Sequence, residues 1–411
     1  MYRSIEKSQT LLINTQSKRL EKNGKKIIKF GFGQSPFLPP KRVMEALQAS
    51  AHRKEYSSVQ GDEELRSLIA TFHHDHNGLL TNPDDILVAP GSKILLFNIV
   101  LSYESLDVIL PGPSWVSYEP QVKLAGHNSI RINTTYERRW RLIGEDIKRA
   151  ISQKKCRNTA LIINYPGNPD GLTYTKDELE DIAEVCRKHN VLVISDEIYG
   201  LLDHNQSHIS FGTIYPENTI TTTGLSKWCG AGGWRLGLAL LSEGISEGLK
   251  ETLLGLGSET YSCAPMPVQI AAREAYRDFE ETKGYLQYQV NILSQISKYC
   301  SSRLVENDIM TYNGEGGFYL FPSFKRLENQ LSKIGVEGSS SLSERLLNDI
   351  GVATLPASAF GMSDDTFALR MAYVDFDESK FINTQFDLED HCPNVIHGIE
   401  EIMDWVSKLM R

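Results

Sequence analysis

The segment from Thr223 to Gly237 reads Thr-Gly-Leu-Ser-Lys-Trp-Cys-Gly-Ala-Gly-Gly-Trp-Arg-Leu-Gly. It places Lys227 and Arg235 in a glycine-rich stretch that separates two apolar runs. An upstream apolar run ends in Ser195-Asp-Glu-Ile-Tyr199, and a further one ends in Asn164-Tyr-Pro-Gly-Asn-Pro-Asp-Gly171. An asparagine, an aspartate, a tyrosine, a lysine and an arginine therefore follow successive predicted strands in one order.

The central part of the chain alternates short apolar runs with amphipathic helical patterns. Several runs are apolar at successive positions, which is typical of strands that are covered on both faces and belong to a mostly parallel sheet. Thr175-Lys-Asp-Glu178 is a capping box that predicts a helix ending near His189. The fold class is therefore α/β, with a three-layer large domain. The predicted strands are Ile86–Ala89, Asp107–Leu110, Ser129–Ile132, Ala160–Asn164, Val191–Ser195, Thr219–Thr223 and Leu236–Leu240.

The 411 residues exceed what one ordinary core holds, so we expect two domains. Helical patterns dominate from Ile245 to Leu304, followed by strand-like pieces and a closing helix from Pro393 to Leu409. We predict a large domain over 43–283 and a smaller α+β domain formed by 1–42 and 284–411. A long helix near 270–300 would join them.

Composition excludes several kinds of partner. The net charge of -9 disfavours nucleic acid and acidic membranes. The longest apolar run is too short to span a bilayer, and the amino-terminal residues lack a signal-peptide pattern. The six cysteines show no metal-binding or paired spacing, which favours reduced thiols and a cytoplasmic location. His73-His-Asp-His76 carries side chains that would splay around a helix, so we expect no metal.

Lys227 and Asp196 are the candidate catalytic groups of a pyridoxal phosphate site. Such a site needs a lysine shielded from water to form a Schiff base with the cofactor aldehyde. It also needs a carboxylate beside the pyridine nitrogen, which keeps the ring protonated as an electron sink. Taken alone, Lys227 reads as a surface loop lysine and Asp196 as a helix cap. Glu197 competes with Asp196, but we expect its side chain to point to the other face.

Other candidates surround this pair. Tyr199 and Asn168 can hydrogen-bond the ring oxygen of the cofactor, although the segment around Asn168 also reads as a plain β-turn. The phosphate needs donors, and we expect them at a predicted helix start and at Arg235, whose alternative is a structural ion pair. Trp115 can stack on the ring, or belong to the core. The residues expected at the phosphate are Gly91, Ser92, Lys93 and Arg235.

Arg370 interrupts a strand-like apolar run from Phe367 to Tyr373. A buried charge there needs a partner. The carboxylate of a substrate is one candidate, because it can bind a guanidinium in bidentate fashion. An internal carboxylate is the other.

Together these motifs resemble the class I/II aminotransferases, the fold-type-I pyridoxal phosphate enzymes related to aspartate aminotransferase. The resemblance extends from Gly31-Phe-Gly33 to Arg370. It implies a seven-stranded, mostly parallel sheet and a homodimer with shared active sites. It implies that Lys227 carries the internal aldimine and moves the substrate proton. It further assigns Gly33 to the substrate site, Tyr56 to the phosphate of the partner subunit and Arg370 to the α-carboxylate.

The chain departs from the pattern of this family at some positions. Gly224 stands where a phosphate-binding serine is usual, and Asp170 stands where a threonine is usual. We can place no second arginine for a side-chain carboxylate. We expect an aminotransferase that moves an amino group from an L-amino acid to a 2-oxo acid. Two alternatives stay open: another pyridoxal phosphate reaction (β-lyase, decarboxylase, cyclase or oxidase) or a regulator that senses an amine.

Overall fold

The computed structural model describes residues 9–381 and 385–410. Its centre is a seven-stranded sheet in the order β2-β8-β7-β6-β5-β3-β4. Strand β8 is antiparallel to both its neighbours, and the other pairs are parallel. All seven predicted strands are present, with ends shifted by no more than two residues. They are β2 (Ile86–Ala89), β3 (Leu106–Gly112), β4 (Asn128–Asn133), β5 (Asn158–Asn164), β6 (Leu192–Asp196), β7 (Thr219–Gly224) and β8 (Gly237–Leu241).

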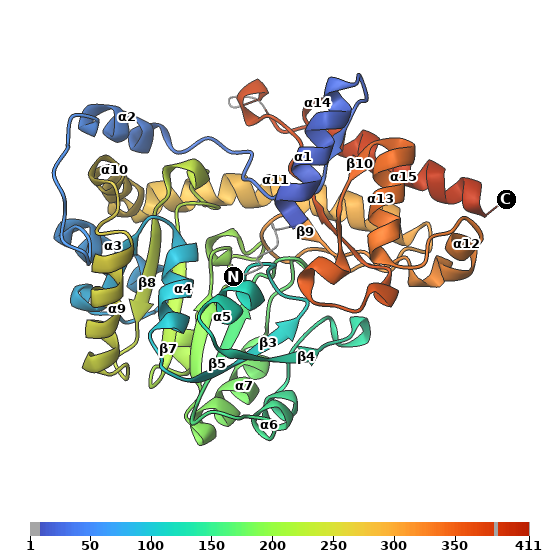
Figure 1. The fold of residues 1–411 in the computed structure, drawn as a ribbon. Helices are drawn as coiled ribbons and strands as arrows, with labels where there is room; N and C mark the ends of the chain where they lie inside the picture. The colour runs from blue at the N-terminus through green and yellow to red at the C-terminus, as the bar shows by residue number, and fades with distance from the viewer. Residues whose placement is uncertain (1–8, 382–384, 411) are drawn as a thin grey trace.

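Helices cover both faces of this sheet, which explains the continuous apolar runs (Figure 1). On β5, Ala160 and Ile162 pack toward one helical layer, whereas Leu161 and Ile163 pack toward the other. The first layer contains α4 (Ser92–Leu101), α5 (Tyr118–Leu124) and α9 (Glu247–Thr260). The second contains α6 (Gly144–Ile151), α7 (Lys176–His189) and α8 (Phe211–Ile214). The predicted α/β architecture with a helix-covered, mostly parallel sheet is confirmed.

The capping box predicted at Thr175 forms as expected. The Thr175 side chain accepts from the Glu178 amide, and the Glu178 carboxylate accepts from the Thr175 amide. Two amide groups that would otherwise lack partners at the start of α7 are thereby satisfied. At the other end, Asn190 adopts the left-handed conformation that stops the helix.

Beyond β8 the chain becomes mainly helical. The long helix α11 (Phe279–Val305) runs from the side of the large sheet to the side of α13 and α15 (Figure 1). The remaining helices are α1 (Gln9–Lys22), α2 (Lys41–Ser50), α3 (Glu63–Asn77), α10 (Met266–Arg277), α12 (Glu328–Lys333), α13 (Ser339–Ile350), α14 (Leu388–His391) and α15 (Pro393–Leu409).

A second, three-stranded sheet has the order β11-β12-β9 and is antiparallel. It consists of β9 (Tyr319–Leu320), β11 (Leu355–Pro356) and β12 (Leu369–Ala372), while β1 (Ile28–Lys29) pairs with β10 (Val352–Ala353). The division at residues 42 and 283 stays a prediction, and residues 1–8 of the smaller unit lie outside the described part. Within residues 9–381 and 385–410, none of the helices combines the length and apolarity needed to cross a bilayer.

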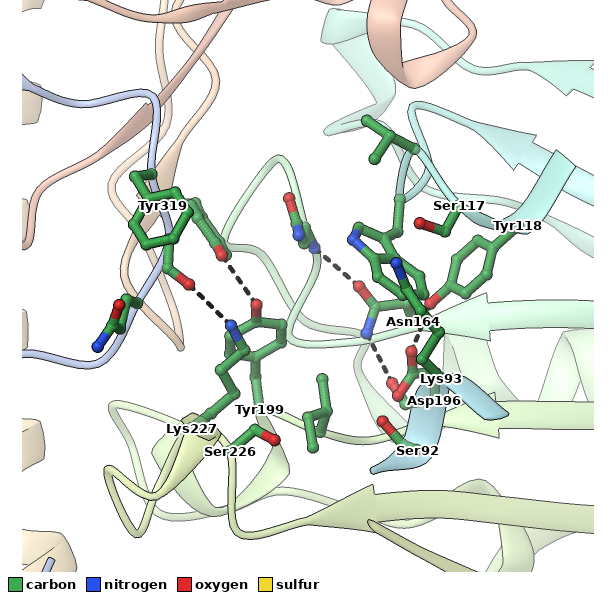
Figure 2. A pocket seen from close by; sticks show the side chains of 18 of the residues that line it. Ser92, Lys93, Ser117, Tyr118, Asn164, Asp196, Tyr199, Ser226, Lys227 and Tyr319 are labelled. Carbon is green, nitrogen blue, oxygen red and sulfur yellow. Dashed lines mark hydrogen bonds between the residues drawn. The ribbon is translucent and has the colours of Figure 1, made fainter. Parts of the chain in front are cut away.

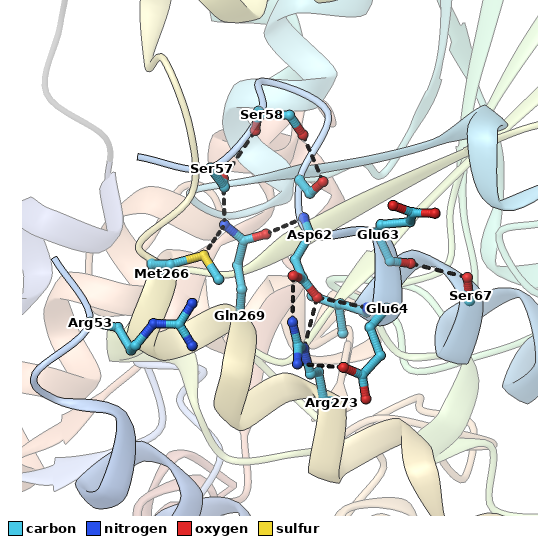
Figure 3. A network of polar contacts seen from close by, with 12 residues as sticks. Arg53, Ser57, Ser58, Asp62, Glu63, Glu64, Ser67, Met266, Gln269 and Arg273 are labelled. Atoms are coloured by element: carbon cyan, nitrogen blue, oxygen red, sulfur yellow. Dashed lines mark hydrogen bonds and ion pairs between the residues drawn. The ribbon is translucent and has the colours of Figure 1, made fainter. Parts of the chain in front are cut away.

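A polar network fastens the segment before α3 to α10 (Figure 3). The buried Gln269 side chain accepts from the Asp62 amide at 2.8 Å and donates to Ser57 Oγ at 2.9 Å and to the Ala264 carbonyl at 2.8 Å. One helix turn later, Arg273 holds both carboxylate oxygens of Asp62. The loop that carries Tyr56 is therefore anchored on its carboxyl side.

We predict that Gln269→Leu lowers the free energy of unfolding by about 2 kcal/mol, because an apolar side chain leaves buried polar groups without partners. The control is Gln287→Leu, at an exposed position of α11. This substitution should change the free energy of unfolding by less than about 0.5 kcal/mol. Urea unfolding followed by circular dichroism measures both. Equal midpoints for the two variants would show that the network does not stabilise the fold.

Candidate active site

A pocket of about 560 Å³ lies at the carboxyl edge of the large sheet, where it faces the three-stranded sheet (Figure 2). Its volume is within the range of small-molecule sites. Parallel α/β sheets bind ligands at this edge because the loops after successive strands converge there. The predicted site residues that line it are Gly33, Ser92, Lys93, Trp115, Asn168, Asp196, Tyr199, Lys227, Arg235 and Arg370.

Strand register places Asp196 between two polar side chains. Asp196 is opposite Asn164 of β5 and opposite Thr222 of β7. Its Oδ2 accepts from the Tyr118 hydroxyl at 2.6 Å, and its Oδ1 accepts from Thr222 Oγ1 at 3.3 Å. Asn164 Nδ2 donates to the Asp196 carbonyl at 2.7 Å. The carboxylate is thus held by hydroxyl groups at the floor of the pocket.

The Asp196 carboxylate is buried, and no cation pairs with it among the ion pairs of the described residues. Burial raises the pKa of Asp196 to about 6, although the Tyr118 and Thr222 hydroxyls oppose this rise. The alternative interpretation, a helix cap, is wrong: the cap position of the following 3-10 helix Gly200–Leu202 is Tyr199. A cationic ligand group beside Asp196 would supply the missing charge.

Glu197 points away from this pocket, as expected for the neighbouring strand position. Its carboxylate accepts from His208 Nε2 at 2.9 Å, from Ser195 Oγ at 2.8 Å and from Ser210 Oγ at 2.9 Å. These bonds hold the pKa of Glu197 below its ordinary value despite burial. Glu197 therefore belongs to a polar cluster on the opposite face and does not compete with Asp196.

Lys227 extends into the pocket and is half-buried. Its Nζ donates to the Gly33 carbonyl at 2.8 Å and lies 5.4 Å from the centre of the Tyr199 ring. It has no carboxylate partner in the part of the chain that the structure describes. The interpretation as a solvated surface lysine is therefore wrong, and the amine is held by one neutral acceptor and aromatic walls.

Arg370 and Asn168 meet on the side of the three-stranded sheet. Arg370 is buried in β12, where its Nη1 donates to Asn168 Oδ1 at 3.2 Å and its Nη2 donates to the Gly31 carbonyl at 2.7 Å. Its Nε has no hydrogen-bond partner, and no internal carboxylate pairs with it among the described residues. Burial lowers the pKa of this guanidinium, which nonetheless stays charged. Of the two predicted partners, the internal carboxylate is thus excluded for the described residues.

Asn168 belongs to a turn, which is the alternative interpretation of this segment, and its side chain also lines the pocket. The Gly171 amide donates to the Gly167 carbonyl at 2.9 Å, which closes the turn. The Asn168 amide donates to Asn164 Oδ1 at 2.8 Å, and this bond aims the Asn168 side chain into the pocket. The turn is the means by which the sheet presents this side chain.

The opposite end of the pocket is cationic and rich in free amides. Helix α4 begins at Ser92 after Gly91, whose φ is 94°, and no side chain caps it. A Cβ at Gly91 would lie 2.0 Å from Arg235 Nη2, so the guanidinium sits directly against this helix start. Lys93 Nζ lies 4.9 Å from the Trp115 ring centre, and burial together with Arg235 lowers its pKa. This arrangement suits a phosphate.

Two departures from the family pattern have structural reasons. A Cβ at Gly224 would lie 2.5 Å from the Leu236 carbonyl oxygen, so β7 and β8 leave no room for a serine there. Asp170 is buried and accepts from Arg141 Nη2 at 2.8 Å, a pairing that accounts for the carboxylate in this turn. Ser226, the residue before Lys227, lines the pocket.

Tyr56 does not line the pocket of its own chain. Its side chain is 87% exposed, on the loop anchored by Gln269. Such exposure leaves it available to another molecule, which is where the resemblance expects it.

Several pocket residues were not predicted from the sequence. Asn164 lines the pocket, and Thr222 donates to the Asp196 carboxylate. Both could have been found, because both stand at the carboxyl ends of predicted strands beside Asp196. The sequence around Tyr118 and Tyr319 gives no comparable indication of a site. Each side chain lines the pocket because of the way α5 or β9 packs in the complete fold. Tyr319 O–H lies 2.9 Å from the Tyr199 hydroxyl.

The charges of the pocket fit pyridoxal phosphate. Four basic side chains line it, and none forms an ion pair with a carboxylate within the described residues; they are Lys93, Lys227, Arg235 and Arg370. One buried carboxylate, Asp196, lacks a cation. A ligand with a phosphate, an aldehyde for the lysine and a basic ring nitrogen complements all of these features.

Comparison with known proteins agrees with this chemistry. The model of the family "Aminotransferase class I and II" matches residues 25–380. An aspartate aminotransferase from Bacillus sp. (strain YM-2) is 32% identical over 384 residues, covering 90% of this chain and 93% of its relative. Aromatic-amino-acid aminotransferase 2 from Thermococcus litoralis is 30% identical over 362 residues, covering 84% and 87% of the two chains.

Solved structures show the same fold. The aspartate aminotransferase from Thermus thermophilus with maleate superposes with a TM-score of 0.84 at 25% identity, covering 98% of this chain and 100% of that one. The aromatic aminotransferase from Pyrococcus horikoshii gives 0.80 at 27% identity, covering 95% and 98%. The chain therefore belongs to the class I and II aminotransferase family, and it is a transaminase that uses pyridoxal phosphate.

Proposed function

We propose that this enzyme moves an amino group between an L-amino acid and a 2-oxo acid with Lys227, Asp196 and Tyr199 at the reacting centre. The observation that carries these roles is the pairing of an unneutralised buried carboxylate with an unpaired lysine in one pocket. Pyridoxal phosphate, when bound, supplies an aldehyde that condenses with amines and a ring that accepts electrons from the substrate Cα–H bond. The chain supplies orientation, charge and proton transfer.

Asp196 holds the proton on the ring nitrogen. Its carboxylate lies at the pocket floor with both oxygens oriented by Tyr118 and Thr222. An anion at this place favours the protonated ring, because an opposite charge at close range stabilises the charged form. Tyr199 and Asn168 line the same pocket and would hydrogen-bond the ring oxygen of the cofactor.

Lys227 supplies the amine that holds the aldehyde and then moves the proton. Its Nζ rests on a backbone carbonyl, an acceptor that leaves it free to react. With cofactor and substrate bound, Nζ would be the base that accepts the proton from the substrate Cα and the acid that gives it back. The rings of Tyr199 and Phe318 lie 5.4 and 5.5 Å from Nζ.

Arg370 binds the α-carboxylate of the substrate. Its guanidinium is buried, forms no ion pair among the described residues, and has an Nε without a hydrogen-bond partner. It can therefore donate two parallel hydrogen bonds to a carboxylate. Asn168 and the Gly31 carbonyl hold the guanidinium in position. Gly33 would border the substrate through its backbone, because it lines the pocket and its carbonyl accepts from Lys227. Ser92, Lys93, Gly91 and Arg235 would hold the phosphate.

The pocket offers apolar as well as polar side chains to the substrate. Arg235 and Arg370 are the arginines among the residues that line the pocket. With one assigned to the phosphate and the other to the α-carboxylate, neither remains for a second carboxylate. The apolar side chains that line the pocket include Leu11, Phe32, Val116 and Ile198. Relatives of this chain are named for aspartate and for aromatic amino acids, so both kinds of amino acid are the donors to test.

We propose a cytoplasmic homodimer in which Tyr56 completes the phosphate site of the partner. All six cysteines are free thiols, as expected in a reducing compartment. Tyr56 is almost fully exposed in the single chain, and the buried polar contacts behind it position its loop. A mostly exposed tyrosine on an anchored loop is suited to an interface.

We predict that the holoenzyme passes through a complete half-reaction. An amino acid donor should convert the visible absorption band of the bound cofactor to the pyridoxamine form, and a 2-oxo acid should restore it. Aspartate and aromatic amino acids are tested first. Lys227→Ala should lack the band and lose activity by at least about 10⁴-fold. If the wild type instead releases carbon dioxide, ammonia or a β-substituent without conversion, it catalyses another reaction on this scaffold.

We predict that Asp196→Asn stabilises the cofactor-free protein at neutral pH. The pKa of Asp196 rises on folding from its ordinary value to about 6. The folded protein therefore binds this proton more tightly than the unfolded chain, and the free energy of unfolding falls as pH rises from about 4 to 6. Above that range the variant should be more stable than the wild type by about 1–3 kcal/mol, and near pH 4 by much less.

Urea unfolding of both cofactor-free proteins at pH 4.5 and 7.5 checks this sign. With pyridoxal phosphate bound, the order should reverse, because the variant lacks the anion that holds the ring proton. A stability difference that does not change between the two pH values would mean that Asp196 is not a buried charge in solution.

We predict complementation between two defective subunits. A hybrid dimer of a Lys227→Ala subunit and a Tyr56→Ala subunit contains one site with both residues intact, provided that Tyr56 serves its partner. That site should bind pyridoxal phosphate with wild-type affinity, whereas the Tyr56→Ala homodimer binds it about 10-fold more weakly. A hybrid of Lys227→Ala with wild type is the reference. If the test hybrid binds no more tightly than the Tyr56→Ala homodimer, Tyr56 does not act across the interface.

A further inference from the structure

Tyr319 contacts both Tyr199 and Arg370, and none of the roles proposed above accounts for these contacts. It lines the pocket from β9 and is buried to 1% exposure. We infer that Tyr319 is a positioning residue that supports Tyr199 through its hydroxyl group and Arg370 through its ring. The inference rests on the proposed role of Tyr199 at the cofactor ring oxygen.

The hydroxyl groups of Tyr319 and Tyr199 lie 2.9 Å apart and can bond in either direction. A phenol has a single hydrogen to donate and lone pairs to accept. When Tyr199 donates to the ring oxygen of the cofactor, only Tyr319 can be the donor between the two. A tyrosine that accepts one hydrogen bond becomes a stronger donor in the next, because the bonds polarise one another. Tyr319 would thus strengthen the bond from Tyr199 without touching the cofactor.

Sheet register brings the Tyr319 ring to Arg370. Tyr319 of β9 lies directly opposite Ala372 of β12. Arg370 is two residues from Ala372 on the same strand, so it shares the face of Tyr319 as a diagonal neighbour. The guanidinium carbon lies 4.8 Å from the ring centre. The Tyr319 ring therefore lies against the buried guanidinium of Arg370. Such a cation–π contact is stronger where water is excluded.

Two glycines from distant motifs make room for Tyr319. A Cβ at Gly33 would lie 1.9 Å from the Tyr319 hydroxyl oxygen, and a Cβ at Gly171 would lie 2.2 Å from the Tyr319 carbonyl oxygen. The Gly33 carbonyl is also the acceptor for Lys227. The segment that carries the lysine acceptor is therefore packed against the side chain of Tyr319, and the asparagine turn is packed against its backbone. Together these contacts fix the position of Tyr319, which is labelled in Figure 2.

The two contacts can be separated by substitution. Tyr319→Phe removes the hydroxyl group and keeps the ring over Arg370, whereas Tyr319→Leu removes both. Tyr174 provides the matched control: it is a buried tyrosine outside the pocket, with the Arg141 guanidinium 4.5 Å from its ring centre and its hydroxyl accepting the Leu142 amide at 3.1 Å. Tyr174→Phe and Tyr174→Leu therefore report general effects of losing such a tyrosine.

The first measurement is the pH midpoint at which the visible band of the bound cofactor titrates in the holoenzyme. A hydrogen bond to the ring oxygen favours its anionic form and weakens its hold on the neighbouring proton, so losing that bond raises the midpoint. Tyr319→Phe should raise it by about 0.2–0.7 pH unit, as expected for a cooperative share of a charge-assisted bond. Tyr199→Phe should raise it further, and adding Tyr319→Phe to Tyr199→Phe should change nothing more.

The second measurement separates KM from kcat for the best amino donor. Tyr319→Phe should leave KM within about twofold, whereas Tyr319→Leu should raise KM by about 3- to 30-fold through the loss of the ring beneath Arg370. The Tyr174 variants should leave the midpoint and KM unchanged.

Each failure has a distinct meaning. If Tyr199→Phe itself leaves the midpoint unchanged, the proposed role of Tyr199 fails. If Tyr199→Phe shifts it but Tyr319→Phe does not, or if the two shifts simply add, the hydroxyl part of the inference is overturned. Equal KM values for the Phe and Leu variants would overturn the ring part.

Discussion

An unneutralised buried carboxylate is the constraint around which the pocket is arranged. Asp196 stands at the end of a central parallel strand, where the sheet aligns it with Asn164 and Thr222. Hydroxyl groups orient the carboxylate but supply no positive charge, and its pKa rises as a result. A buried charge without a counter-ion costs stability, and proteins keep such groups where a ligand completes them. We propose that the ring nitrogen of pyridoxal phosphate completes this one.

The basic side chains that line the pocket also lack partners of opposite charge among the described residues. Four basic side chains face the cavity without an ion-pair partner among the described residues, while nearby basic residues outside it are paired. Arg141, for example, pairs with Asp170, which is two residues after Asn168 in the sequence. The distinction between a structural arginine and a binding arginine therefore lies in what surrounds each guanidinium. In the proposed function, Lys93 and Arg235 hold the cofactor phosphate and Arg370 holds the substrate carboxylate.

Small residues decide how closely the distant segments approach. Gly224 allows β7 and β8 to pair beside the lysine loop, and Gly91 allows Arg235 to rest against the start of α4. Gly33 abuts the Tyr319 side chain and Gly171 abuts the Tyr319 backbone carbonyl, so the amino-terminal segment, the asparagine turn and the small sheet meet at this one residue. The active site is thereby assembled from three parts of the chain that share no local sequence signal. Their common feature is close backbone approach, which any side chain larger than hydrogen would prevent.

The sequence by itself determined the sheet and the principal site residues. Buried strands of the α/β kind leave continuous apolar runs, and polar residues directly after them must lie at one edge, so Asn168, Asp196 and Lys227 could be placed without coordinates. What only the tertiary structure decided is which charges stay unpaired and which rings lie beneath them. Arg370 could have faced an internal carboxylate, and Tyr118 and Tyr319 could have been ordinary core residues. Those outcomes depend on contacts between residues more than fifty positions apart, and no local pattern encodes such distances.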